Sequence, residues 1–503
     1  MDEARLHPAW VVLLAPLAGA LVTLSLAPFG FWPAGILSCA LYAWLLSRCT
    51  PRQALWRGWL YGLGLFGSGV SWVYVSIHVY GYASVPLAAL LTVLFCAGLA
   101  LLQALFAGVY VRWVRALPGG MLVGFPALWV LFEWLRSWLF TGFPWLFLGY
   151  AHLDNWLAGW APILGVYALS FATVLTGSCL FLAWRSRQAA ALATYAVILV
   201  TLWGGGAILR PIEWVVPGAA EPLSVALYQP DIPQERKWSP GEFPRIVEQF
   251  ERALPRQYGH DIILWPESAL PRFYHQVRDI LDPIDSHARL LDETLITGIP
   301  WREAGSDQYY NSIVALGAGE GLYHKQRLVP FGEYVPLESW LRGLIAFFDL
   351  PMSGFSAGPP GQDLLVANGY RLAPFICYEI VYPDLVAEGA RRADLLVTIS
   401  NDSWFGASIG PLQHLEMARM RALETGRYLL RGTNNGVSAI IDHRGRILAQ
   451  SPQFEEVVLT GEAQVMLGST PFASFGSRPV LSACLLVLLL MLVLYHTLWR
   501  END

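Results

Sequence analysis

The sequence predicts a polytopic α-helical membrane bundle of about eight transmembrane helices that carries one large α/β domain. The chain is 55% hydrophobic and 14% charged, whereas average soluble domains carry about 25% charged residues. Seven apolar stretches fill the first 209 residues, and an eighth lies near the C-terminus. Between them, short β-branched runs alternate with longer amphipathic segments. That alternation is typical of an α/β layered domain.

Each apolar stretch is close to the roughly 20 residues that a helix needs to cross a bilayer. The second is the shortest. The first has the position of a secretory signal, but its apolar run is too long and further stretches follow, so we expect an uncleaved helix. The expected spans are 9–27, 32–47, 57–79, 85–111, 121–140, 162–184, 189–209 and 480–498.

Arginines in the short loops predict the orientation of the bundle. Loops 28–31, 80–84 and 141–161 contain no Lys or Arg, and the alternate side carries all of these charges. By the positive-inside rule the Arg-bearing side is cytoplasmic, so both termini are expected there and the polar insert outside the inner membrane. The Arg-bearing positions are Arg5, Arg48, Arg52, Arg57, Arg112, Arg115, Arg185, Arg187 and Arg500. The predicted domains are 1–209 (helices one to seven), 210–479 (an extracytoplasmic domain) and 480–503 (the last helix and tail).

Charge and motif content argue against several functional classes. The formal net charge is −5 and no basic stripe is present, so no nucleic-acid partner is expected. The ten histidines are scattered, without His-Glu-x-x-His or Cys-x-x-Cys spacing, so no metal site is predicted. The run GAGEG at 317–321 fails the dinucleotide spacing, and no cofactor is predicted.

Within the insert, residue patterns predict seven strands and four helices. The expected strands are 223–229, 261–266, 294–300, 312–317, 372–377, 394–400 and 436–442. The expected helices are 241–258, 274–292, 381–391 and 411–430.

One cysteine stands apart from the rest. Of six cysteines, five fall in or at the ends of apolar stretches, where a small buried hydrophobe is the ordinary interpretation. Cys377, in PFICYEIVYPDL, is the only thiol of the predicted extracytoplasmic domain and has no partner there. The number of cysteines in the domain leaves two interpretations of Cys377 open, an inert core residue or a reactive thiol.

Three candidate catalytic residues fall at or just past strand ends, where α/β sites usually form. Glu267 lies in WPESALP, Lys325 in YHKQRLVPFGEYVP, and Cys377 ends LAPFIC. The chain has only two lysines, Lys237 and Lys325, among 33 basic residues. Such a bias suggests that Lys325 does what arginine cannot, since an ammonium is compact, has three donors and can lose its proton when buried.

Together these residue types could carry out acyl transfer. A carboxylate can take the proton of a thiol, which then attacks a carbonyl. An ammonium and a backbone N–H can hold the resulting oxyanion. Glu267, Cys377 and Lys325 fit these roles, with the peptide N–H of Tyr378 as a second oxyanion donor. A Cys–His pairing through His324 or His414 stays open.

In this order the three motifs resemble those of the nitrilase, or carbon–nitrogen hydrolase, superfamily, and SNDSWFG and RGTNNGVSAIIDHRGRI extend the likeness. A nitrilase-like domain inserted before the last membrane helix resembles the apolipoprotein N-acyltransferase family of bacterial inner membranes. The resemblance implies an αββα sandwich, with Glu267 as general base, Lys325 as oxyanion stabiliser and Cys377 carrying the acyl chain as a thioester. It also maps supporting residues onto Trp238, Glu333, Tyr378 and Glu379.

The implied substrates are lipids. A phospholipid, typically phosphatidylethanolamine, would acylate the cysteine, and the α-amino group of a diacylglyceryl-cysteine apolipoprotein would accept the chain. The enzyme would therefore be a multi-pass inner-membrane protein with a periplasmic catalytic domain. Membrane lipids would surround it, and its 22 tryptophans suit an interface at headgroup depth. Among them, Trp145, Trp238 and Trp404 are the candidates for lining the site.

Two other functions remain open on the sequence. One is a membrane-anchored amidase that uses water as the acceptor. The other is a transporter or receptor whose outer domain only binds ligand, although that reading gives Glu267, Lys325 and Cys377 no common purpose. Glu133 and Arg136, a charged pair deep in a span, are either a mutual ion pair or a functional site.

Overall fold

The computed structural model describes residues 8–303, 305, 307–330, 332–334 and 354–500, so Arg5 and the end of the Lys325 motif lie outside it. The chain divides into two compact units. The helical unit comprises Met1–Tyr74, Pro86–Ile212 and Phe475–Asp503. The α/β unit comprises Glu213–Ser474 together with Val75–Val85, a short segment from the N-terminal half of the chain.

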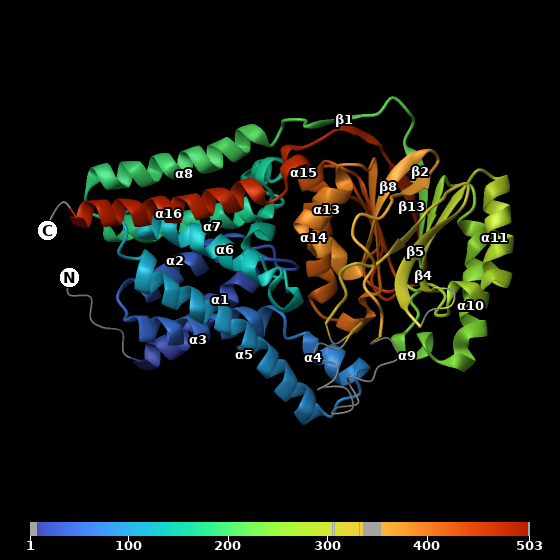
Figure 1. Cartoon of the computed structure of the whole chain (residues 1–503), viewed down its shortest axis with the longest axis horizontal. Helices are drawn as coiled ribbons and strands as arrows, with labels where there is room; N and C mark the ends of the chain where they lie inside the picture. Colours follow the sequence, from blue (N-terminus) through green and yellow to red (C-terminus); the bar gives the residue numbers. More distant parts are fainter. Residues whose placement is uncertain (1–7, 304, 306, 331, 335–353, 501–503) are drawn as a thin grey trace. The chain divides into compact units, whose positions relative to one another are not determined.

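Every predicted apolar stretch contains a helix (Figure 1). These are α1 (Pro8–Ser25), α2 (Pro33–Ser47), α3 (Pro51–Gly69), α5 (Val85–Val109), α6 (Phe125–Arg136), α7 (Ala161–Arg185), α8 (Ala189–Leu209) and α16 (Arg478–Arg500). Within the described residues, four continuous helical segments are long and apolar enough to cross a membrane, and a bent pair brings the number to five. The chain is a membrane protein, and the total of eight spans stays a prediction.

The third predicted span, 57–79, is not one continuous helix. α3 ends at Gly69, and after a break α4 (Val73–Val75) and the π-helical turn η1 (Ser76–Tyr80) continue at an angle of 63°. The sequence at the break, GSGVSW, combines glycine and serine, which are weak helix formers and recur at helix kinks. The predicted span is therefore a bent helix pair, and whether the two parts form one span stays a prediction.

Small residues allow close packing inside the helical unit. A Cβ atom on Gly64 of α3 would lie 1.9 Å from the carbonyl oxygen of Pro16, so α1 and α3 touch through their backbones. Close backbone approach at small residues is the usual way in which helices associate in lipid. Beside this contact, the rings of Tyr42 and Tyr61 stack with centroids 3.8 Å apart.

Glu133 and Arg136 both face protein. The Oε1 atom of Glu133 accepts hydrogen bonds from Trp129 Nε1 at 3.0 Å and from the backbone N–H of Leu148 at 3.1 Å. The Arg136 guanidinium lies over the ring of Phe147 at 5.3 Å. These contacts join α6 to the segment around Leu148, which gives both charged residues a structural role.

The α/β unit contains two six-stranded sheets. Their strand orders are β13-β2-β3-β4-β5-β6 and β12-β11-β10-β9-β8-β7, and a separate β1-β14 pair completes the unit. The strands are β1 (Val215–Pro217), β2 (Leu223–Gln229), β3 (Ile262–Leu264), β4 (Thr294–Arg302), β5 (Tyr309–Gly317), β6 (Leu322–His324), β7 (Leu365–Ala367), β8 (Tyr370–Ile376), β9 (Leu395–Ser400), β10 (Leu429–Thr433), β11 (Ala439–Ile441), β12 (Ile447–Gln450), β13 (Val457–Ala463) and β14 (Met466–Gly468).

Helices cover the outer faces of the sheets, with α10 and α11 on one side and α13 and α14 on the other (Figure 1). The helices are α9 (Gln234–Lys237), α10 (Phe243–Ala253), α11 (Arg278–Leu290), α13 (Pro383–Ala390), α14 (Gly410–Thr425) and α15 (Pro471–Phe475), and the short turns η11 (Cys377–Val381) and η12 (Asp402–Phe405) follow β8 and β9. Apolar side chains from both sheets, such as Leu227 and Val397, share one buried cluster. This arrangement confirms the predicted αββα sandwich.

One predicted helix extends beyond the observed helix at its C-terminal end. Helix 411–430 ends at Thr425 because Gly426 adopts the left-handed conformation (φ +65°) that closes many helices. The chain then turns back into β10, a fully buried strand in the middle of its sheet. Leu430 lies seven positions after Leu423, so the helical spacing of apolar residues continues past the glycine and obscures that boundary in the sequence.

Candidate active site

Glu267 lies just beyond β3 and is held from three directions. Its Oε1 accepts a hydrogen bond from Asn311 Nδ2 at 2.7 Å, and its Oε2 accepts one from the backbone N–H of Asn401 at 2.8 Å. The backbone carbonyl of Glu267 accepts a third, from Lys237 Nζ at 2.8 Å. A glycine is needed beside it, because a Cβ on Gly298 would lie 2.7 Å from the Glu267 Cα.

Lys325 follows β6 and is only 1% exposed. Its Nζ donates to Glu333 Oε1 at 2.8 Å and lies 3.4 Å from Glu267 Oε1. Asn311 Nδ2 also bridges the two carboxylates. Burial lowers the pKa of Lys325, but the charges of Glu333 and Glu267 outweigh it and raise the pKa above its ordinary value. Lys325 therefore stays an ammonium at neutral pH, and its compact shape, not the loss of its proton, is what arginine could not supply.

Cys377 stands at the turn between β8 and η11, with a backbone φ of +53°. This left-handed conformation is strained for a residue with a side chain and recurs at functional sites. Cys377 is partly accessible, while the other five cysteines of the chain are buried. Its accessibility and its strained backbone favour the reactive thiol over the inert core residue.

The charges around Cys377 act on its thiol. Burial raises the pKa of this thiol, Glu267 raises it further, and Lys325 lowers it. Glu267 and Lys325 thus both lie within electrostatic reach of the sulfur. At neutral pH the thiol carries its proton at rest, so attack on a carbonyl requires a base beside it. The fold brings together the three residues that the sequence singles out.

Glu379 links the turn that carries Cys377 to the loop that carries Lys325 through hydrogen bonds. Its Oε2 accepts the backbone N–H of Ile376 at 2.8 Å, and its Oε1 accepts the N–H groups of Gln326 and Arg327 at 2.7 and 3.2 Å. The hydroxyl of Tyr323 donates to the same Oε1 at 2.9 Å. Ile376 and Gln326 are the neighbours of Cys377 and Lys325, so this one carboxylate sets the position of one catalytic candidate relative to the other.

Comparisons with known proteins agree with this arrangement. The family model of the apolipoprotein N-acyltransferase N-terminal domain matches residues 18–179, and the carbon–nitrogen hydrolase model matches residues 224–472. The curated apolipoprotein N-acyltransferases of Azotobacter vinelandii and Pseudomonas syringae pv. tomato are 48% and 49% identical to this chain; each alignment covers 96% of it and 95% and 96% of theirs. The chain belongs to the apolipoprotein N-acyltransferase family. It is an acyltransferase, and an amidase has less support.

A further curated apolipoprotein N-acyltransferase, from Pseudomonas aeruginosa, is 47% identical over 94% of both chains. Among solved structures, Saccharomyces cerevisiae Nit3, a member of branch 10 of the nitrilase superfamily, matches 50% of this chain and 92% of its own at 19% identity and a TM-score of 0.37. The nitrilase-like fold is assigned from the family model and the two sheets.

Two tryptophans of the acyltransferase that the sequence proposes as site residues lie in the α/β unit. Trp238 directly follows α9, and its buried indole Nε1 has no hydrogen-bond partner among the described residues. Trp404 lies on η12, where its backbone carbonyl accepts a hydrogen bond from Ser76 Oγ at 2.7 Å. Its ring meets that of Tyr80 edge-on at 5.7 Å. The segment Val75–Val85 thus packs against the loop that carries Trp404.

Trp145 belongs to the helical unit of the acyltransferase. Its side chain is 1% exposed, and its ring packs against those of Trp72 and Phe143. This is the packing of a core residue. Its role in lining the site, like those of Trp238 and Trp404, stays a prediction.

Two acyltransferase residues beside Glu267 were missed by sequence reasoning. The scarcity of lysine that singles out Lys325 applies equally to Lys237, which is buried and bonds the backbone of Glu267. Burial lowers the pKa of Lys237 to about 8. Asn311 bridges both carboxylates, but no pattern marks it, because it lies 44 positions from Glu267, near the start of β5.

The two histidines that could have paired with the cysteine have other partners. His324 shares a hydrogen bond with Ser312 at 2.7 Å and stacks on Tyr310. His414 reaches Cys377 through the cysteine's backbone carbonyl oxygen, at 3.1 Å. Among the described residues, no cluster of three or more His, Cys, Asp or Glu could hold a metal ion.

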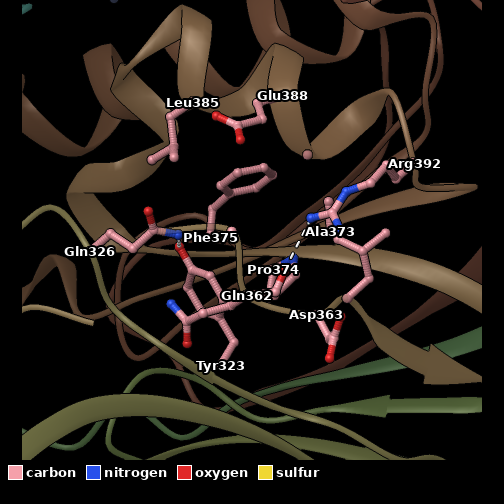
Figure 2. Close-up of a pocket in the computed structure, with 13 residues that line it drawn as sticks. Tyr323, Gln326, Gln362, Asp363, Ala373, Pro374, Phe375, Leu385, Glu388 and Arg392 are labelled. Atoms are coloured by element: carbon pink, nitrogen blue, oxygen red, sulfur yellow. Dashed lines mark hydrogen bonds between the residues drawn. The ribbon is translucent and has the colours of Figure 1, made fainter. Parts of the chain in front are cut away.

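Figure 2 shows a pocket in the α/β unit. It is lined by Tyr323, Gln326, Gly361, Gln362, Asp363, Leu364, Ala373, Pro374, Phe375, Leu385, Glu388, Gly389 and Arg392. Tyr323 links this pocket to Glu379. Within the described chain Glu267, Lys325 and Cys377 do not line it, so it is not the place where the acyl group is transferred.

The acyltransferase should lose activity in mild acid through Glu379. Burial raises the pKa of this carboxyl to about 7. Above that pH the carboxylate accepts its N–H donors, and below it a proton disrupts those bonds. We expect the rate of acyl transfer to fall about tenfold between pH 8 and pH 6 because of this group. Glu379→Gln should be slower throughout and flat over that range. If the rate of the Glu379→Gln enzyme still falls between pH 8 and pH 6 as that of the parent enzyme does, the assignment to Glu379 is wrong.

Proposed function

We propose that this acyltransferase moves an acyl chain from a membrane phospholipid, by way of a thioester on Cys377, to the α-amino group of a diacylglyceryl-cysteine apolipoprotein. Phosphatidylethanolamine is the proposed donor. The convergence of Glu267, Lys325 and Cys377 in the α/β unit carries the proposal. The names of its curated relatives support the acceptor.

In the first half-reaction, Glu267 takes the proton of the Cys377 thiol as the sulfur attacks an ester carbonyl of the phospholipid. The carbonyl π electrons move onto oxygen, and Lys325 together with the N–H of Tyr378 stabilises that oxyanion. When the intermediate collapses, the C–O bond to the glycerol breaks. The leaving oxygen takes the proton back from Glu267, and a lysophospholipid departs.

In the second half-reaction, the free amine of the acceptor attacks the thioester carbonyl. Glu267 accepts a proton from the attacking nitrogen, and the same donors hold the oxyanion. Collapse breaks the C–S bond, and the thiolate regains its proton from Glu267. The products are an N-acylated lipoprotein and the original enzyme. Glu333, which shares Lys325 with Glu267, keeps the lysine charged and in place through both steps.

The proposed placement follows the loop arginines. The multi-pass helices lie in the bacterial inner membrane, both termini are cytoplasmic, and residues 210–479 form the periplasmic catalytic domain. Both lipid substrates remain in the bilayer, so a site at its outer surface is where they meet. An apolar entrance to such a site would limit the access of water, which competes with the amine.

The experiment that tests this function follows the acyl group by mass. Purified enzyme is incubated with phosphatidylethanolamine of defined chains, and its intact mass is measured before and after a diacylglyceryl peptide is added. We expect one added acyl group, which then moves to the peptide amine. Release of free fatty acid without N-acylated peptide would indicate the amidase instead, and an unchanged enzyme mass would reject the thioester.

A further inference from the structure

The backbone carbonyl of Cys377 lies against a buried histidine. His414, on α14, is 0% exposed, and its Nε2 is 3.1 Å from that carbonyl oxygen. A carbonyl oxygen can only accept, so the ring carries its hydrogen on Nε2. The thiol of Cys377 lies within electrostatic reach of Glu267 and Lys325, while its backbone carbonyl is held by a separate element, α14.

The other side of the His414 ring is held by two charged residues. Its Nδ1 lies 3.1 Å from Asp402 Oδ1 and 3.2 Å from Arg431 Nη2, and Arg431 also donates to Asp402 Oδ2 at 2.7 Å. Burial, helped by the charge of Arg431, lowers the pKa of His414, so the ring is neutral. With the hydrogen on Nε2, the lone pair of Nδ1 accepts from Arg431, and Asp402 acts on the ring through Arg431, because two acceptors cannot bond each other.

Peptide planarity links this bond to the chemistry. The oxygen that His414 contacts and the N–H of Tyr378 belong to the same peptide unit, where C=O and N–H point in opposite directions. Fixing the direction of the oxygen therefore fixes the direction of the N–H. A hydrogen bond to the oxygen also polarises the unit and strengthens its N–H as a donor.

We propose that the buried His414–Asp402–Arg431 cluster positions the oxyanion site, by holding the Cys377–Tyr378 peptide so that the Tyr378 N–H faces the developing oxyanion. His414 is a positioning residue and touches no reacting atom. The inference rests on the proposed acyl transfer at Cys377 and names a device that serves it in both half-reactions.

The free-energy cost of burying an ion pair supports a role for this cluster beyond packing. Asp402 and Arg431 are an ion pair with both side chains 0% exposed, and buried pairs of this kind often stabilise a fold no better than apolar residues would. Cys377 also keeps a strained φ of +53°, which persists only where neighbours fix it. Glu379 accepts the backbone N–H of Ile376, the residue before Cys377, and His414 contacts the backbone carbonyl of Cys377 itself.

The test compares His414→Leu, which removes the donor, with His414→Gln, whose amide can still donate. His260→Leu is the matched control, because His260 also contacts a backbone carbonyl, that of Gln257, elsewhere in the unit. Full-length enzymes are assayed for kcat and KM of acylation by phospholipid. Two inhibitors are added: a long-chain aldehyde, whose adduct with Cys377 carries a tetrahedral oxygen, and a diether phospholipid, which has no carbonyl.

We expect His414→Leu to lower kcat about tenfold to a hundredfold, somewhat less than the loss of a whole oxyanion donor. KM should change less than about twofold. Aldehyde inhibition should weaken by the same factor as kcat, diether inhibition should not change, and His414→Gln should recover much of the loss. Equal weakening of both inhibitors, unchanged kinetics, or a glutamine variant as slow as leucine would overturn the proposal.

If the leucine variant does not fold, His414→Gln carries the test alone. A loss of kcat matched by aldehyde affinity supports positioning of the oxyanion donor, and a loss without any change in aldehyde affinity overturns it. An unsubstituted enzyme that never takes up an acyl group would instead reject the proposed function, so the two failures are distinguishable.

Discussion

Cys377→Ser enzyme exposed to phospholipid should keep its original mass and form no N-acylated peptide, a loss of at least about 10⁴-fold in turnover. A hydroxyl is far harder to ionise than a thiol, and burial beside Glu267 already raises the pKa of the thiol. A carboxylate that can deprotonate sulfur in this site is too weak a base for serine. Intact-mass spectrometry and peptide acylation measure both losses.

The matched control for this prediction is Cys484→Ser. Cys484 lies on α16 and is buried in the helical unit, so the same chemical change there should leave acylation intact. An acyl adduct of normal amount on Cys377→Ser would place the nucleophile elsewhere, and the proposed site would be wrong.

Glu267→Gln should slow acylation of Cys377 about 10³-fold while making the thiol easier to ionise. The rate falls because the amide cannot take the proton from sulfur. The pKa of the thiol should fall, because the charge of Glu267 raises it and the charge of Lys325 lowers it. Once the carboxylate is removed, Lys325 is the largest remaining charge acting on the thiol, and Asp402 opposes it less. The variant should therefore react with iodoacetamide at a lower pH than the parent enzyme, yet accept acyl groups far more slowly.

Opposite changes in the two reactions distinguish a lost base from a damaged fold. A damaged fold would change the reactivity of the thiol toward both reagents in the same direction. Glu242→Gln removes a carboxylate that pairs with exposed arginines and should change neither rate. Acylation by Glu267→Gln at the parent rate would show that another group takes the proton.

Local patterns in the sequence were enough to find the three central residues. Glu267 and Cys377 lie at the ends of predicted strands, and Lys325 stands out as one of only two lysines in the chain. The α/β class was predictable from the alternation of strand-like and helix-like segments, although β10 was not, because Leu430 continues the helical spacing of Leu423 past the glycine that ends α14. The break after Gly69 was likewise hidden inside a continuous apolar stretch.

The groups that hold the catalytic residues were not predictable in this way. The backbone N–H of Asn401 bonds Glu267 from 134 positions away, and His414 reaches the carbonyl of Cys377 from another helix. Asparagine, histidine and backbone N–H groups occur throughout any chain, so nothing local distinguishes the few that meet a carboxylate or a carbonyl.

The sequence by itself determined the membrane helices, the α/β class and the identities of the thiol, carboxylate and ammonium, because hydropathy, periodicity and scarce residue types are local properties. Only the tertiary structure decided the distance between Lys325 and its two carboxylates, the strained turn at Cys377 and the histidine behind it. Those features depend on how two sheets pack face to face, and packing joins residues that share no pattern along the chain.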